Sequence, residues 1–278
     1  MPRPLGLHQL TLMDVGPLEL IEIAAACGYQ HVSLFTNAPV VPIAGQEGKF
    51  QFPTVTPELK GDVLARLGSH GLDVINAEFF LMRSDVDLET YRPGLALGRE
   101  LGAINAMTHI FEPDPVRAAD ILGRFCAIAA EVDMRVSIEF CQMTPGCKSI
   151  HAAKAFVDAV GAANLGFGIC PMHLVRSGGT AADIAALDPR LLFYGQLNDG
   201  HGLHISEAYF EEVHDRQLPG NGDFPLADIM RALPASAPIE VKCPSDSRRK
   251  AAVSALDYAR DAFERAQKLD RSGHRTNR

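Results

Sequence analysis

Two glutamates stand in stretches of the sequence that are otherwise mainly apolar. Glu139 lies in VSIEF and Glu240 lies in PIEVK. Burying a carboxylate in an apolar strand costs free energy unless the carboxylate is paired with a cation or bound to a metal ion. A surface-facing or salt-bridged position would explain one such glutamate equally well. Two of them on converging strands favour a functional site, where carboxylates bind metals or move protons.

Further polar residues fall where other apolar runs end. Imidazole, thiol, amide and carboxyl groups are those that metal sites and acid–base catalysis use. The residues in question are His8 or Gln9, Glu78, His109, Cys170 with His173, and Gln196 with Asp199. For His8, Glu78 and His109 the pattern leaves two interpretations open, a place in the wall of a substrate pocket and a purely structural role.

The elements that must position these residues are marked by glycines. A helical pattern over 18–27 ends at Gly28, and a short strand is expected at 30–34. A second helix opens with Thr56-Pro57 and stops at Gly71 before the run 73–77, and a third stops at Gly102 before 103–108. Glycine commonly caps a helix in the left-handed conformation. Three such junctions predict alternating helices and strands.

The second half of the chain continues the alternation. Strands are expected at 134–140, 165–170, 191–197 and 239–241, with an opening strand at 5–10, and helices at 116–129, 148–160, 180–187, 226–233 and 253–263. Eight strand–helix units of roughly 35 residues predict a single (β/α)8 TIM barrel over 1–268, with a flexible polar tail over 269–278. A doubly wound sheet is the alternative, but it usually carries a GxGxxG turn, which the sequence lacks. In a barrel, the irregular connection 36–57 would lie at the catalytic face.

Composition narrows the classes of partner. The sequence has 26 Lys and Arg against 34 Asp and Glu, a net charge of −8. This balance opposes a nucleic-acid partner, which needs clustered basic residues. The six cysteines form no CxxC pair, and we find neither a long apolar membrane segment nor a secretory signal. We therefore expect a cytoplasmic protein that takes a small-molecule substrate, with a homo-oligomer left open.

Several motifs together resemble a known family. The sequence resembles the xylose isomerase-like barrels, the sugar phosphate isomerase/epimerase group, over nearly its whole length. The matching motifs are IEF at 138–140, CPMH at 170–173, QLND at 196–199, RQLPGNGD at 216–223 and IEV at 239–241. The run at 216–223 is the most specific of them.

The resemblance implies a divalent metal ion held by Glu, Asp, His and Glu on the last four strands. Glu139 and Glu240 match the two glutamates, whereas Gln196 stands where His is usual and Cys170 where Asp is usual. A thiolate ligand would favour zinc or iron over magnesium or manganese. Cys170 is equally well explained as a small buried hydrophobic residue. The metal is therefore left open among Mn, Mg, Co, Zn and Fe, and its presence is an expectation.

The resemblance also implies a reaction. A metal on Glu139, Gln196 and Glu240 would polarise the carbonyl of a carbohydrate-like hydroxy-carbonyl substrate and stabilise its enediolate. One glutamate would remove the proton beside the carbonyl and the other would return it. His173 would bind a substrate oxygen, or else be a core histidine. Arg216 would hold a hydroxyl, carboxylate or phosphate, or else be a solvated loop charge.

Three other functions compete with an isomerase or epimerase. A lyase or dehydratase would use the same proton abstraction on a sugar-like or aromatic-degradation intermediate and then expel a leaving group. A non-catalytic small-molecule binder would have lost its metal site. A DNA-repair endonuclease of the same superfold is disfavoured, because it needs several metals and the charge of −8 opposes DNA.

Overall fold

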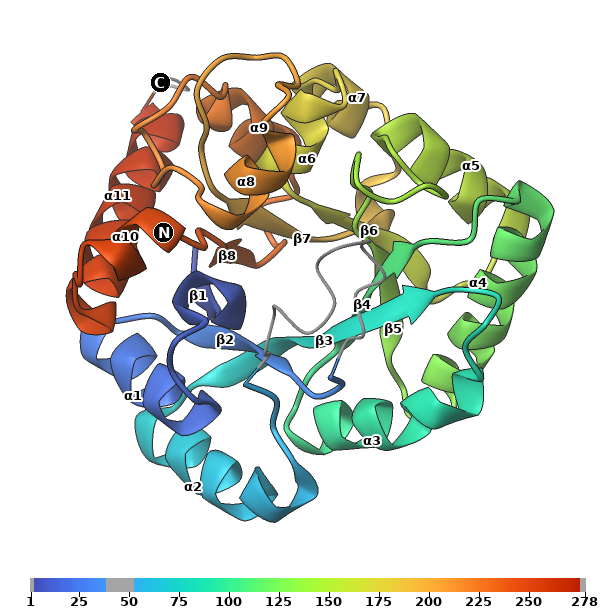
Figure 1. The fold of residues 1–278 in the computed structure, drawn as a ribbon, viewed down its shortest axis with the longest axis horizontal. Helices are drawn as coiled ribbons and strands as arrows, with labels where there is room; N and C mark the ends of the chain where they lie inside the picture. The colour runs from blue at the N-terminus through green and yellow to red at the C-terminus, as the bar shows by residue number, and fades with distance from the viewer. Residues whose placement is uncertain (1–2, 39–52, 276–278) are drawn as a thin grey trace.

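The protein is described here from a computed structural model, which covers residues 3–38 and 53–275. Eight parallel strands form a closed barrel, each paired with the next and the last with the first (Figure 1). The strands are β1 (Leu5–His8), β2 (His31–Phe35), β3 (Asp73–Met82), β4 (Asn105–Ile110), β5 (Arg135–Ile138), β6 (Leu165–Ile169), β7 (Leu192–Leu197) and β8 (Ile239–Val241). This confirms the predicted (β/α)8 barrel.

Helices surround the barrel on the outside (Figure 1). The longer ones are α1 (Pro17–Cys27), α2 (Lys60–His70), α3 (Arg92–Glu100), α4 (Pro115–Ala130), α5 (Ile150–Val160), α9 (Leu226–Ala232) and α11 (Ala255–Arg275). Three short helices were not predicted: α6 (Pro171–Arg176), α8 (Tyr209–His214) and α10 (Asp246–Lys250). Helix α7 (Ala181–Ala185) is shorter than expected. Four short 3-10 turns are η1 (Gln9–Leu12), η2 (Pro57–Leu59), η3 (Leu88–Tyr91) and η4 (Pro189–Leu191).

The glycine junctions work as predicted. Gly28 and Gly71 cap α1 and α2 with φ of 91° and 63°, and Gly102 follows α3 with φ of 96°. A side chain disfavours this left-handed conformation, so glycine ends each helix and turns the chain toward the next strand. The opening strand is shorter than expected. It stops at His8, whose ring nitrogen Nδ1 accepts a hydrogen bond from the Leu10 amide and starts η1.

The interior of the barrel is filled with side chains, as in other barrels of this kind. Tyr194 on β7 is fully buried there and packs with Ile75 and Phe193. A methyl group on Gly168 of the neighbouring β6 would lie 2.3 Å from the Tyr194 ring. The ring therefore needs glycine beside it and closes the barrel beneath the polar residues described next.

The expected connection 36–57 and the expected C-terminal tail are only partly covered by the described residues. Helix α11 continues to Arg275, so the chain is helical beyond residue 268. Part of the expected connection 36–57 lies outside the described residues, as do residues 276–278. Among the residues described, no helix is long and apolar enough to cross a membrane.

Candidate active site

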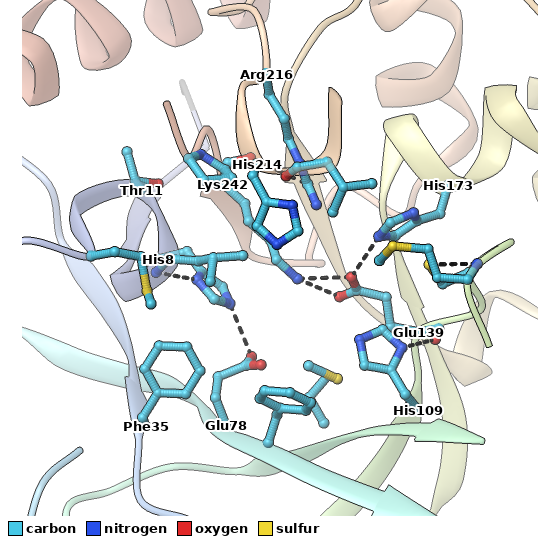
Figure 2. Close-up of a pocket in the computed structure, with 18 of the residues that line it drawn as sticks. His8, Thr11, Phe35, Glu78, His109, Glu139, His173, His214, Arg216 and Lys242 are labelled. Carbon is cyan, nitrogen blue, oxygen red and sulfur yellow. Dashed lines mark hydrogen bonds and ion pairs between the residues drawn. The ribbon is translucent and has the colours of Figure 1, made fainter. Parts of the chain in front are cut away.

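A cavity opens where the strands end, at the face that carries the active site in barrels of this kind (Figure 2). Its volume of about 120 Å³ is several times the roughly 15 Å³ that one water molecule requires. A small organic molecule therefore fits. The polar lining includes the predicted residues His8, Glu78, His109, Glu139, His173 and Arg216, together with Lys242, which the sequence analysis did not single out.

Glu139 and Lys242 form a buried ion pair in the cavity. The Lys242 Nζ lies 2.8 Å from both carboxylate oxygens of Glu139, and the side chains are 3% and 1% exposed. Burial alone would raise the pKa of Glu139, but the Lys242 ammonium and then His173 hold it well below its usual range. Burial would lower the pKa of Lys242, yet Glu139 and then Glu78 raise it. Both groups are therefore charged at neutral pH.

Two further donors complete the surroundings of Glu139. The Gln196 amide nitrogen lies 3.0 Å from Oε2, and His173 Nε2 lies 3.3 Å from Oε1. The other ring nitrogen of His173 lies 2.8 Å from the Tyr209 hydroxyl. Against the effect of burial, Cys141, Tyr209 and Cys170 raise the pKa of His173 well above its usual value. The imidazole is thus a second cation against Glu139.

Glu240 and Gln196 lie beneath the cavity. The Gln196 amide nitrogen donates to Glu240 Oε1 at 2.8 Å as well as to Glu139. Ser33 donates to Glu240 Oε2, and Asn76 Nδ2 lies 3.3 Å from both oxygens. Both Glu240 and Gln196 are 0% exposed, and neither is among the described residues that line the cavity. The predicted ligands Glu139, Gln196 and Glu240 are therefore brought together by hydrogen bonds.

Glu78 faces the cavity beside His8. The two side chains approach to 3.2 Å between His8 Nε2 and Glu78 Oε1, but with poor hydrogen-bond geometry. Neither Glu78 oxygen has a hydrogen-bond partner within the described parts of the chain. Burial raises the pKa of Glu78 to about 8 and lowers that of His8 to about 3. At neutral pH the imidazole is therefore neutral and the carboxyl is mostly protonated.

His109 lies across the cavity from His8 and Glu78 (Figure 2). Its Nδ1 lies 2.7 Å from the backbone carbonyl of Glu139. Burial lowers the pKa of His109 to about 4, so the ring is neutral and Nδ1 carries the proton that it donates to this carbonyl. The other nitrogen, Nε2, then holds a lone pair that can accept a proton.

Arg216 reaches the site from the motif at 216–223. Asp199 organises this loop, because its carboxylate accepts hydrogen bonds from the backbone of Gly200, Gly220 and Phe224. A methyl group on Gly222 would lie 2.5 Å from the same carboxylate, so the motif needs glycine there. The Arg216 side chain is buried rather than solvated, and it lines the cavity.

Cys170 lies behind the cavity wall. Its Sγ is 3.4 Å from Arg216 Nη1 and 3.4 Å from Asn198 Nδ2. Burial would raise the pKa of the thiol, but His173 and Arg216 lower it to about 6. Cys170 is 1% exposed and is not among the described lining residues.

Two groups of buried side chains bring potential metal ligands close together. In each group the ligand atoms lie within 4.8 Å of one another; the groups are Glu139, Cys170 and His173, and His8, Glu78 and Glu240. Neither group is the predicted set, since Glu139 and Glu240 belong to different groups. The Gln196 oxygen points away from both carboxylates and has no hydrogen-bond partner in the described residues. The predicted set thus presents an amide N–H, not an oxygen, where a metal would lie.

A family model described as a xylose isomerase-like TIM barrel matches residues 21–268. The chain belongs to this family. The match confirms the resemblance that the sequence motifs indicated. No curated protein sequence matches the chain.

Several solved structures superpose on nearly the whole chain. A xylose isomerase domain protein from Alicyclobacillus acidocaldarius is 20% identical, with a TM-score of 0.77 over 98% of this chain and 99% of that one. The IolI protein with a bound zinc atom is 15% identical, with a TM-score of 0.75 over 98% of both chains. D-allulose 3-epimerase from Methylomonas sp. with D-allulose is 16% identical, with a TM-score of 0.70 over 98% of both. At these identities the similarity shows the fold alone.

Proposed function

We propose that the protein is an isomerase or epimerase that moves a proton beside the carbonyl group of a small hydroxy-carbonyl compound. The observation that carries this proposal is the Glu78 carboxyl, which faces the cavity with a pKa of about 8 and no hydrogen-bond partner in the described residues. A buried polar group without a partner suggests that a ligand supplies one. A pKa near the working pH suits a group that exchanges protons.

Glu78 and His109 are the proton-transfer groups in this proposal. The neutral His109 Nε2 takes the proton from the carbon beside the carbonyl, and the C–H electron pair forms the C=C bond of an enediolate. The protonated Glu78 then donates to the other face of the same carbon, which inverts its configuration. Donation to the neighbouring carbon, with the hydroxyl proton passing between the two substrate oxygens, would instead move the carbonyl. Afterwards, a proton returns from His109 to Glu78 through solvent.

Lys242 stabilises the enediolate oxygen in this scheme. An ammonium has three N–H donors, and two of them contact Glu139. The third is available to a substrate oxygen in the cavity, where it stabilises developing negative charge. Arg216 and His173 are two more cationic side chains in the lining. The proposal keeps the predicted substrate-binding roles of His173 and Arg216, and it transfers the proton-moving role predicted for Glu139 and Glu240 to His109 and Glu78.

Deuterium exchange tests this function before the substrate is known. The protein is incubated in D2O with a panel of hydroxy-ketones, hydroxy-aldehydes and ketose sugars, and proton NMR follows the signal beside the carbonyl. We expect deuterium to enter that position in at least one compound. Glu78→Gln should slow formation of the epimerised or isomerised product by roughly 100- to 10,000-fold, the usual contribution of a positioned acid or base, because Glu78 delivers the proton that completes either reaction. Absence of exchange in every compound would contradict the proposal.

One wall of the cavity favours a substrate with an apolar group. Phe35, Phe79, Leu81 and Met107 form a cluster separate from the main core, and Leu10, Met13 and Phe111 pack against it. All of them except Leu81 line the cavity. These apolar side chains can pack against a nonpolar part of a substrate. We therefore add hydroxy-carbonyl compounds with an aryl substituent to the panel, and expect Phe79→Ala to raise KM for those compounds more than for a ketose.

A lyase or dehydratase is the second candidate function. The Glu78 carboxyl is mostly protonated at neutral pH, so it can also protonate a departing β-hydroxyl as water. The same NMR experiment separates the two reactions. A new alkene or dicarbonyl signal indicates elimination, whereas a changed configuration or a moved carbonyl indicates epimerisation or isomerisation.

A further inference from the structure

The Glu139 carboxylate is surrounded by hydrogen-bond donors from other side chains. A carboxylate has about four lone-pair positions, two on each oxygen. Here Oε1 lies 2.8 Å from Lys242 Nζ and 3.3 Å from His173 Nε2, and Oε2 lies 2.8 Å from Lys242 Nζ and 3.0 Å from the Gln196 amide. Every position is therefore used by a side chain. A metal ion could bind Glu139 only by displacing one of these donors.

Glu240 has the same arrangement with neutral donors. Its Oε1 accepts from Gln196 and Asn76, and its Oε2 accepts from Ser33 and Asn76. Gln196 points its nitrogen at both glutamates. Turning the amide to offer its oxygen to a metal would place that oxygen against two carboxylates. The hydrogen-bond network thus fixes the amide orientation that metal binding would have to reverse.

Two other candidate ligands, His8 and Cys170, are engaged as well. His8 Nδ1 accepts the Leu10 amide at 2.9 Å, so the proton of this neutral ring lies on Nε2, the nitrogen that faces Glu78. The Cys170 sulfur accepts from Arg216 and Asn198, both at 3.4 Å. A metal in either cluster would need a new tautomer of His8 or the release of Arg216 from the sulfur. The residues present do not fit a metal ion as they are arranged.

We infer that the Lys242 ammonium takes the place of the divalent metal ion in this barrel, holding Glu139 and supplying the positive charge that a substrate oxygen meets. Lys242 follows Glu240 by two residues, directly after β8 ends at Val241. Its amide still donates to the Leu197 carbonyl of β7, so the alternation of the strand continues into Lys242 and places it on the same face as Glu240. Its stem therefore rises from beside Glu240 to the cavity, where Nζ reaches Glu139 (Figure 2). The statement about the substrate oxygen rests on the proposed function, whereas the statement about metal does not.

Metal content and metal-dependent melting test the inference without any substrate. The purified full chain is analysed for bound metal, treated with EDTA, desalted and melted with added Mn²⁺, Co²⁺ or Zn²⁺. We expect no stoichiometric metal before treatment and no rise in Tm on addition. A stoichiometric metal whose removal lowers Tm, and whose return restores it, would overturn the inference.

The Lys242→Met variant gives the complementary result. Removing the ammonium leaves the buried charge of Glu139 with only His173 and Gln196 to stabilise it, and a divalent cation can then take the vacated position. We expect the substitution to lower Tm. Added metal should then raise the Tm of this variant but not that of the wild type. Lys250→Met, on the exposed side of α10, is the matched control and should respond as the wild type does. Equal metal-dependent shifts in the wild type and Lys242→Met would contradict the inference.

A second variant covers the case in which Lys242→Met does not fold. Lys242→Met with Glu139→Gln removes both charges, so it should fold and its Tm should be insensitive to metal. If added metal raised the Tm of this double variant and of the wild type by the same amount, metal binding would not involve this pair. That result would overturn the inference. Deuterium exchange that survives EDTA supports the inference and the proposed function together. A metal-free protein that shows no exchange supports the inference and contradicts the proposed function. Exchange that requires added metal supports the proposed function and contradicts the inference.

Discussion

The Gln196 amide nitrogen bridges two buried carboxylates, lying 3.0 Å from Glu139 and 2.8 Å from Glu240. The two glutamates come from different strand ends, yet one NH2 group serves both. Two carboxylates that close would otherwise repel each other, and each would lose a hydrogen bond. Gln196 therefore stabilises the barrel floor as well as the geometry of the site above it.

The first prediction concerns Gln196→Met, which keeps a similar volume and removes both N–H donors. Leaving buried charged acceptors without their donor costs more than the loss of an ordinary hydrogen bond, so we expect the free energy of unfolding to fall by about 3 kcal/mol. Urea denaturation measures this change. Gln142→Met, at a half-buried loop position, is the control and should change stability by less than about 0.5 kcal/mol. Equal effects of the two substitutions would show that the bridge contributes nothing.

The second prediction concerns the pair of Lys242 and Glu139. Removing one partner of a buried ion pair typically costs about 3–5 kcal/mol, because the other charge remains buried and unpaired. Lys242→Met and Glu139→Gln should each show such a loss, and the double variant should lose clearly less than the sum. Urea unfolding of all four proteins gives the coupling. Additive losses would mean that the two charges do not stabilise each other.

The third prediction concerns the pH dependence of stability at Glu78. Its pKa is about 8 in the folded protein, against an ordinary value of 4.5. Between these values the folded state binds more protons than the unfolded state, so this group loses stability as pH rises toward 8. Glu78→Gln cannot ionise. It should gain stability relative to the wild type by up to about 1.4 kcal/mol for each pH unit in that range.

Urea unfolding of both proteins at several pH values between 5 and 8 measures this difference. His8, which faces Glu78, has a pKa of about 3 in the folded state and is present in both proteins. Its own titration therefore largely cancels in the comparison. A difference in stability that stays constant with pH would show that the Glu78 carboxyl is ionised throughout.

Much of the fold follows from local signals in the sequence. Gly28 and Gly71 mark helix ends because the residue after each helix adopts a positive φ. Glycine adopts this conformation without steric cost wherever it stands, so the signal can be read from the residue type alone. The apolar runs between glycines then locate the strands. The short helices α6, α8 and α10 were missed because each is too brief to show a helical period.

The site was only partly predictable. The place of Glu139, His173 and Arg216 in the cavity lining could be expected, because polar residues at strand ends and in loops reach one cavity in a barrel. Lys242 was overlooked, although it ends the quoted run PIEVK, because lysine is rarely buried without a partner. That partner, Glu139, lies 103 residues earlier in the sequence. The depth of Glu240 depends on how the strands are staggered around the barrel, which a single sequence does not reveal.

The last prediction separates the roles of Glu240 and Glu78 in turnover. Glu240 is fully buried and bonded to Ser33, Asn76 and Gln196, whereas Glu78 lines the cavity with both oxygens unpartnered in the described residues. Glu78→Gln should therefore lower kcat by roughly 100-fold or more. Glu240→Gln should lower it far less and act mainly on Tm. Rates of product formation and thermal melting of both variants, measured at the same pH, decide between them. A larger loss of kcat in Glu240→Gln than in Glu78→Gln, with an unchanged Tm, would return the proton-moving role to Glu240.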